Sequence, residues 1–85
     1  MPWDDARARR FGAALRSLRE ERGLSQESLA FQAGVTKNQV QLIEGGRASG
    51  RRDAVGRSNP RLSTLAGLAD VLGLEVSQLL ARAGL

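Results

Sequence analysis

Residues 25–46 read SQESLAFQAGVTKNQVQLIEGG, and their pattern predicts two short helices joined by a tight turn. Apolar or small residues recur at a helical spacing, which gives each helix one buried stripe and one polar face. These positions are Leu29, Ala33, Val35, Val40 and Ile43. The first helix should run over residues 26–33 and end at Gly34, because glycine adopts the left-handed conformation of a helix end at little cost.

The second helix has its start signal at Thr36. The Thr36 hydroxyl can accept a hydrogen bond from a free backbone N–H, and Gln39 three residues later completes a Thr-x-x-Gln capping box. The helix should therefore begin directly after Thr36. Since only a short turn then separates the two helices, we expect them to cross at a steep angle.

The outward face of the second helix carries polar side chains that suit a DNA major groove. Lys37, Asn38 and Gln41 lie on this face, and Thr36 lies at its start. Asn and Gln pair well with adenine, and Lys pairs with guanine. Any one of these side chains alone would be an ordinary solvated residue. Together, on a short helix with few acids in a basic chain, they favour DNA recognition.

Residues 25–44 resemble the helix-turn-helix of the Cro and phage-repressor family, also called the xenobiotic-response-element type. The likeness covers nearly the whole chain. GAALRSLREERGLSQESLAFQAGV resembles the family's first two helices, LIEGGR the exit of its recognition helix, and NPRLSTLAGLADVLGLEVSQLL its last two helices. The resemblance implies an all-α fold, a compact five-helix bundle of the lambda-repressor type, whose third helix enters the major groove.

The resemblance also implies which residues contact DNA. Gln26 would bind a phosphate and brace the recognition helix, and Arg47 would contact the DNA backbone. Base edges would be read by the outward face, namely Lys37, Asn38 and Gln41. Two residues would both shape the helix start and contact DNA, namely Thr36 and Gln39. Glu44 is expected to hold structure at the end of the recognition helix.

Composition limits the chemistry that this chain can perform. Its 85 residues, taken as residues 1–85, are expected to form one small domain. With no Cys and no His, disulfides, thiolate metal sites and the usual general base are excluded. No apolar run approaches the length of a membrane span, and the acidic start MPWDDARARR is unlike a signal peptide. We expect a cytoplasmic protein that is not an enzyme and needs no cofactor or metal.

Positive charge is concentrated in residues 45–60, GGRASGRRDAVGRSNP, which read as a long basic loop. The formal charge is +2 in residues 1–24, −1 in 25–44, +3 in 45–60 and zero in 61–85, against a total of +4. The family pattern has only a few residues here, so the segment 48–58 is an insertion. The arginines of the loop are Arg47, Arg51, Arg52 and Arg57. They predict either a flap on the DNA backbone or minor groove, or a passive solvated loop.

Three more helices are expected outside the motif. One should span about residues 5–22 with a stripe of Phe11, Leu15 and Leu18, and Trp3 before it either folds back as a hydrophobic staple or meets a partner. A second should begin near residues 61–63 and end at Gly73, with an inward face of Leu62, Leu65, Leu68, Ala69 and Leu72. A third should span about residues 76–83. We assign Leu74 and Leu79 to the core, and some of Val76, Leu80, Ala83 and Leu85 to a two-fold interface.

These observations predict a transcriptional regulator, most simply a repressor, that binds double-stranded operator DNA as a homodimer. The alternative is an antitoxin or another interaction module that binds a toxin or other protein partner as well as DNA. In that case the apolar C-terminal segment or Trp3 would bind the partner. No interaction with a membrane is expected in either case.

Overall fold

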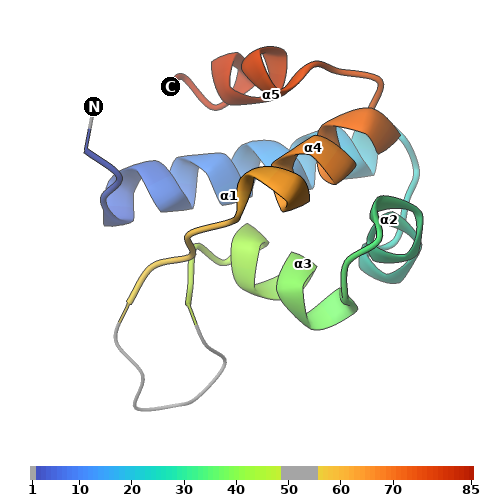
Figure 1. The fold of residues 1–85 in the computed structure, drawn as a ribbon, viewed down its shortest axis with the longest axis horizontal. Coiled ribbons are helices and arrows are strands. Elements are labelled where there is room, and N and C mark those ends of the chain that lie inside the picture. Colours follow the sequence, from blue (N-terminus) through green and yellow to red (C-terminus); the bar gives the residue numbers. More distant parts are fainter. Residues whose placement is uncertain (1, 49–55) are drawn as a thin grey trace.

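The computed structural model describes residues 2–48 and 56–85, and within these ranges the chain is all-α (Figure 1). Its helices are α1 (Asp5–Glu21), α2 (Gln26–Ala33), α3 (Lys37–Glu44), α4 (Leu62–Val71) and α5 (Val76–Arg82). The only β-type pairing in the described residues is an isolated antiparallel bridge between Arg47 and Arg57. The expected five-helix architecture is confirmed, and each helix lies within about one residue of its predicted range.

The first helix begins where its sequence provides a cap. The Asp4 carboxylate accepts a hydrogen bond of 2.9 Å from the backbone N–H of Arg7 and one of 2.7 Å from the Arg7 guanidinium. The backbone hydrogen bond, helped by the guanidinium charge, holds the pKa of Asp4 below its usual value. The buried side of α1 carries Phe11, Leu15 and Leu18, as the spacing predicts.

The helix-turn-helix forms as its local signals indicate. Gly34 ends α2 with φ of 75°, in the left-handed region. The Thr36 hydroxyl accepts from the Gln39 backbone N–H at 3.0 Å, and Gln39 Oε1 accepts from the Thr36 backbone N–H at 2.8 Å. Both halves of the predicted capping box are therefore present. Leu29, Val40 and Ile43 point from the two helices into the core.

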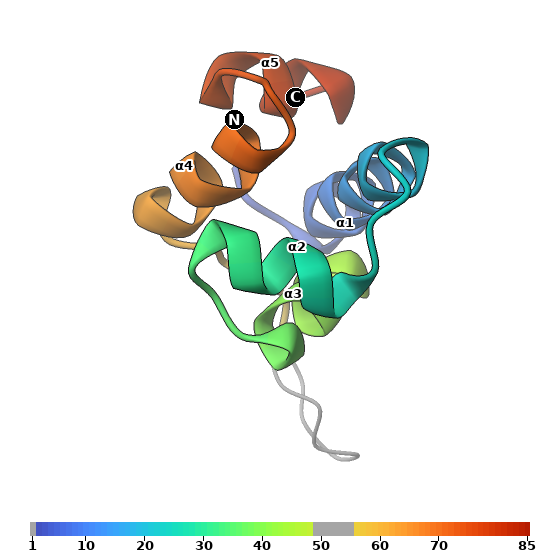
Figure 2. The same ribbon diagram turned by 90° about the vertical axis from the view of Figure 1, so that its right-hand side faces the viewer.

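Two glycines allow neighbouring helices to approach closely. A Cβ at Gly12 of α1 would lie 2.3 Å from the Ile43 carbonyl oxygen of α3. A Cβ at Gly67 of α4 would lie 2.5 Å from the Ala33 carbonyl oxygen of α2. Figures 1 and 2 show the result, in which α2 and α3 lie together on one side of α1 while α4 and α5 close the other sides of the core. The largest fully buried side chains are Phe11, Leu15, Leu29, Val40, Leu68 and Leu79.

Trp3 lies against the core, which confirms that it folds back instead of extending toward a partner. Its ring meets Phe11 edge to face, with centroids 6.2 Å apart. Its indole N–H donates to the Ser58 carbonyl oxygen at 2.6 Å. The N-terminal segment is thus joined both to the core and to the end of the basic loop.

Two side-chain placements differ from the prediction. Leu62 was expected to face inward, but it is 73% exposed because it is the first residue of α4 and the described helices do not cover it. Ala83 was one of four candidates for a two-fold interface, but it is 6% exposed and belongs to the core, since the chain turns back over α1 at the end of α5. Leu74 is half-buried against the core, and Leu79 is fully buried as predicted.

No single helix in the described part of the chain is long and apolar enough to cross a membrane. α4 and α5 reach such a length and hydropathy only as a pair, and they are bent by 84° relative to each other.

Candidate nucleic-acid interface

The third helix presents a polar face to solvent. Lys37, Asn38 and Gln41 are all exposed, and Lys37 and Gln41 are one turn apart, so their side chains share one side of the helix. The opposite side is anchored in the core by Val40 and Ile43. The structure therefore brings together the three side chains that the sequence assigns to base edges, on a surface open to a ligand.

A buried ion pair fixes the far end of this helix. The Arg19 guanidinium of α1 donates to both carboxylate oxygens of Glu44, at 2.7 and 3.1 Å, and also to the Leu24 carbonyl oxygen at 2.8 Å. The two charged side chains are only 12% and 5% exposed. The hydrogen bond to Glu44 raises the pKa of Arg19 above its ordinary value, as expected for a charge-assisted bond.

Gln26 joins the same network at the start of α2. Its side-chain N–H donates to Glu44 Oε1 at 3.0 Å. The predicted brace between Gln26 and the recognition helix is therefore present, and Glu44 holds the helix end as expected. Three helices meet at one carboxylate, and this arrangement fixes the orientation of α3 relative to α1 and α2.

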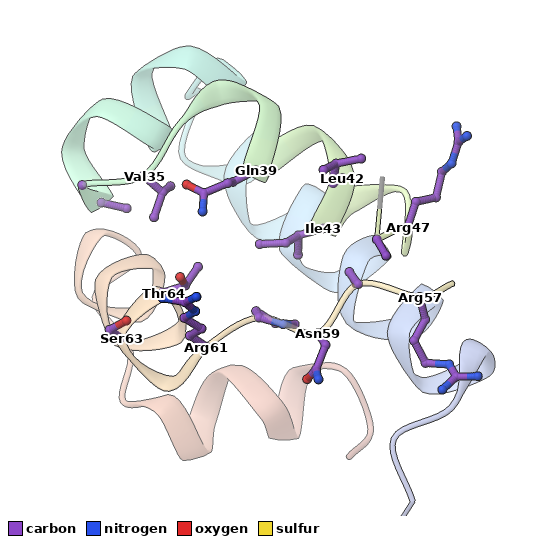
Figure 3. A pocket seen from close by; sticks show the side chains of 15 residues that line it. Val35, Gln39, Leu42, Ile43, Arg47, Arg57, Asn59, Arg61, Ser63 and Thr64 are labelled. Carbon is purple, nitrogen blue, oxygen red and sulfur yellow. The ribbon is translucent and has the colours of Figure 1, made fainter. Parts of the chain in front are cut away.

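A polar groove of about 640 Å³ lies beside α3, between this helix and the segment that leads into α4 (Figure 3). The Gln39 side chain projects from α3 into the groove, facing Arg61 and Thr64 on the other wall. The cations at its rim are Arg47, Arg57 and Arg61. Arg61 is absent from the predicted contacts, although a cation directly after Asn-Pro could have drawn attention to it.

The two ends of the basic loop are held together. The Ser58 N–H donates to the Gly46 carbonyl oxygen at 3.1 Å, and the Ala48 N–H donates to the Gly56 carbonyl oxygen at 3.3 Å. We call residues 46–48 and 56–58 the loop stem. Of the arginines predicted for this loop, Arg47 and Arg57 lie in the stem, whereas Arg51 and Arg52 lie outside the described residues.

Arg57 has a partner that the sequence did not reveal. Its Nε donates to Asp5 at 2.7 Å, across 52 positions of sequence, and both side chains remain largely exposed. Figure 3 shows the Arg57 side chain directed away from α3, toward the beginning of α1. Any phosphate that approaches Arg57 would therefore have to share the guanidinium with Asp5 or displace it.

Within residues 2–48 and 56–85, no three His, Cys, Asp or Glu side chains gather as metal ligands would. Two acids of this region, Glu44 and Asp5, form ion pairs with arginines instead.

Comparison with known proteins agrees with this geometry. Residues 10–82 match a helix-turn-helix domain over most of the chain. The chain belongs to the helix-turn-helix domain family. No curated protein sequence matches it.

Two solved structures resemble the chain in both sequence and fold. The restriction-modification controller protein C.AhdI from Aeromonas hydrophila is 35% identical with a TM-score of 0.70, and the match covers 85% of this chain and 94% of that one. The clp gene regulator ClgR from Corynebacterium glutamicum is 27% identical with a TM-score of 0.75, and the match covers 92% of this chain and 72% of that one. The likeness to two gene regulators supports a DNA-binding regulator.

Proposed function

We propose that this chain is a sequence-specific transcriptional regulator that inserts α3 into the major groove of its operator. The observation that supports this most is the exposed polar face of α3, held in one orientation by the core and by the Arg19–Glu44 ion pair. A recognition element must be rigid, because side chains that read base edges need fixed geometry. The regulatory roles named for C.AhdI and ClgR support the same function.

The proposed contacts divide into those that read sequence and those that position the protein. Lys37, Asn38 and Gln41 read base edges, since they form the exposed face of α3. Gln26 and Arg47 bind phosphates on either side of the reading helix. Two residues bind near the helix start, namely Thr36 and Gln39, and the Gln39 amide keeps an N–H for DNA while its oxygen serves the cap.

The basic loop adds phosphate contacts through Arg51, Arg52 and Arg57. The stem supports this proposal, because it starts only two residues after the end of α3 and carries Arg57 next to the groove. Arg57 exchanges Asp5 for a phosphate on binding. This exchange costs little, because an exposed ion pair is worth only about 0.2–1 kcal/mol.

Binding as a homodimer supplies enough contacts for a long operator site. Two copies on a symmetric site place their recognition helices about 34 Å apart, one turn of DNA. The domain measures 34 × 27 × 21 Å, so two copies can lie side by side at that spacing. Val76, Leu80 and Leu85 remain half-buried and are the proposed interface residues. Repression then requires only that the dimer occupies the promoter, and such a role places the protein in the cytoplasm.

A protein partner is the second candidate function, and one observation favours it. Phe31 on α2 is 87% exposed, and a large exposed aromatic side chain is characteristic of interaction surfaces. An antitoxin that binds both DNA and a toxin would use such a residue. Trp3 is not part of this proposal, because its ring is packed on Phe11. Phe31→Ser should abolish association with a protein partner without weakening DNA binding, and equal loss of both would contradict separate surfaces.

The experiment that tests the main proposal is selection of bound duplexes from a random DNA pool, followed by repetition with variants. Asn38→Ala or Gln41→Ala should cost about 1–3 kcal/mol on the preferred site and relax the preference at particular base pairs. Arg47→Ala should weaken all sequences similarly, because phosphates carry no sequence information. Gln32→Ala, an exposed glutamine on α2, is the matched control. An unchanged preferred sequence in both α3 variants would refute the assigned reading face.

A further inference from the structure

A second groove, of about 470 Å³, opens between the second half of α1 and the first turns of α2 and α3. In the fold, α2 and α3 lie on the same side of α1 (Figure 1). Its lining residues are Arg16, Arg19, Ser25, Gln26, Glu27 and Lys37. Lys37 and Gln26 belong to the proposed DNA contacts, so the groove lies on the surface that faces the operator.

The basic side chains of this groove differ in how strongly the protein already engages them. Arg19 is occupied by Glu44 and the Leu24 carbonyl oxygen. Arg16 has only an exposed partner, Glu20, at 3.5 Å, and such a pair is weak. Lys37 makes no hydrogen bond or ion pair within the described ranges 2–48 and 56–85. Arg16 and Lys37 thus leave two positive charges for an anion between them.

The position of Lys37 is itself unfavourable without an anion. It is the first residue of α3, where the helix dipole is positive and disfavours a cation. Among the described residues that line the groove, Glu27 is the one acid, and it opposes anion binding in part. The positive charges of Arg16 and Lys37 outweigh the one negative charge of Glu27, so the groove suits one phosphate group.

We propose that Arg16 is a further DNA-binding residue, which holds one backbone phosphate in the α1–α2–α3 groove. This inference rests on the proposed DNA-binding function. The strand that borders the major groove passes this site when α3 reads the bases. The planar guanidinium of Arg16 can donate two parallel hydrogen bonds to phosphate oxygens. Lys37 adds attraction from the opposite wall. Arg16 lies nine residues before the helix-turn-helix begins, and no local motif marks it.

The test pairs a protein variant with a neutralised phosphate. A set of operator duplexes is prepared in which one phosphate at a time is replaced by an uncharged methylphosphonate. The affinity of each duplex is measured for the wild-type protein and for Arg16→Gln. We expect Arg16→Gln to bind the unmodified operator about tenfold more weakly. The slope of log affinity against log salt concentration should become less steep by about 0.9. At one position per half-site, the methylphosphonate should weaken the wild type clearly more than Arg16→Gln, which keeps only the attraction of Lys37 for that phosphate. The preferred sequence should not change.

Two control variants isolate the contact from general charge. Arg10→Gln removes the same charge from the same helix but lies in a different groove, against Arg82 and Ala83 of the C-terminal segment. It should retain the full response to every methylphosphonate. Arg16→Lys keeps the charge and should retain most of the salt dependence. Because Arg16 is largely exposed, all three variants should unfold at the wild-type temperature.

The outcomes separate the two proposals. If the wild type selects no sequence at all, the proposed function fails. If the wild type binds its operator but Arg16→Gln responds to every methylphosphonate as the wild type does, Arg16 holds no phosphate and the inference is overturned. Equal losses in Arg16→Gln and Arg10→Gln would overturn it as well.

Discussion

Replacing Gly12 with alanine should destabilise this protein, although alanine is the better helix former. On helix propensity alone, Gly12→Ala in the middle of α1 would stabilise the fold by about 1 kcal/mol. The structure predicts the opposite, because the new Cβ would lie 2.3 Å from the Ile43 carbonyl oxygen and 2.6 Å from that of Glu44. Backbone atoms cannot rotate away as the end of a side chain can. The two helices must separate instead.

The magnitude follows from the required movement. Ordinary contact begins near 3.4 Å, so α1 and α3 must move apart by about 1.1 Å at this point. Overpacking of this kind costs about 1–3 kcal/mol. The same movement stretches the Arg19–Glu44 hydrogen bonds, since Glu44 is one of the residues displaced, and disruption of a buried pair adds to the cost. Lengthening hydrogen bonds to charged groups forfeits about 1–2 kcal/mol. Since helix propensity returns about 1 kcal/mol, we expect a net loss centred near 2–3 kcal/mol.

Thermal unfolding followed by circular dichroism measures this effect. For a chain of this size, the expected loss corresponds to a fall in Tm of roughly 10–20 °C. Gly45→Ala is the matched control, because Gly45 has φ of −86° and a Cβ there would meet its nearest neighbour at an ordinary 3.4 Å. The control should unfold near the wild-type temperature. A Gly12→Ala variant as stable as the wild type would refute the argument from close helix packing.

Three further predictions concern charge. Asp5→Asn should tighten DNA binding about two- to fivefold by releasing Arg57, and titration with operator DNA should show no such gain in an Arg57→Ala background. Because the pKa of Asp4 is lowered in the folded state, its stabilising contribution is complete above its ordinary pKa of 3.8 and is lost as the pH falls through the folded value. Asp4→Asn keeps the cap but not the charge, so its Tm should fall less on acidification below about pH 4, and parallel curves for the two proteins would contradict this. Replacing Arg51, Arg52 and Arg57 together with alanine should preserve the helical spectrum while flattening the salt dependence by up to about 0.9 per lost contact, and an unchanged slope would indicate a passive loop.

The parts of the fold that the sequence predicts correctly depend on local interactions. Gly34 ends α2, and Thr36 with Gln39 begins α3, because each signal acts within a few residues. Helical periodicity places Leu62 on the inward side of α4, but it cannot say whether a neighbouring element covers the first turn. The expectation that Ala83 could lie at an interface was wrong for a related reason, since the turn after α5 depends on where α1 lies.

The same distinction applies to the candidate site. The exposed face of α3 could be predicted, because helix geometry alone brings Lys37, Asn38 and Gln41 to the surface. The Asp5–Arg57 pair could not, because it joins residues 52 positions apart and depends on how the N-terminal segment meets the loop stem. The groove at Arg16 likewise requires three helices to be placed relative to one another. The DNA contacts of these residues stay predictions.

The loop stem makes the insertion a replaceable part of the domain. The hydrogen bond between Gly46 and Ser58 closes the loop, and Trp3 holds Ser58 from the other side, so the two halves of the stem are fixed by contacts of the described residues alone. Loop closure entropy rises only slowly with length, by about 0.6 kcal/mol for each doubling. Segments of different length and sequence could therefore be exchanged at this position. The stem could serve as an insertion site for new DNA-contacting peptides. The DNA specificity of the protein could then be changed without changing the stability of its fold.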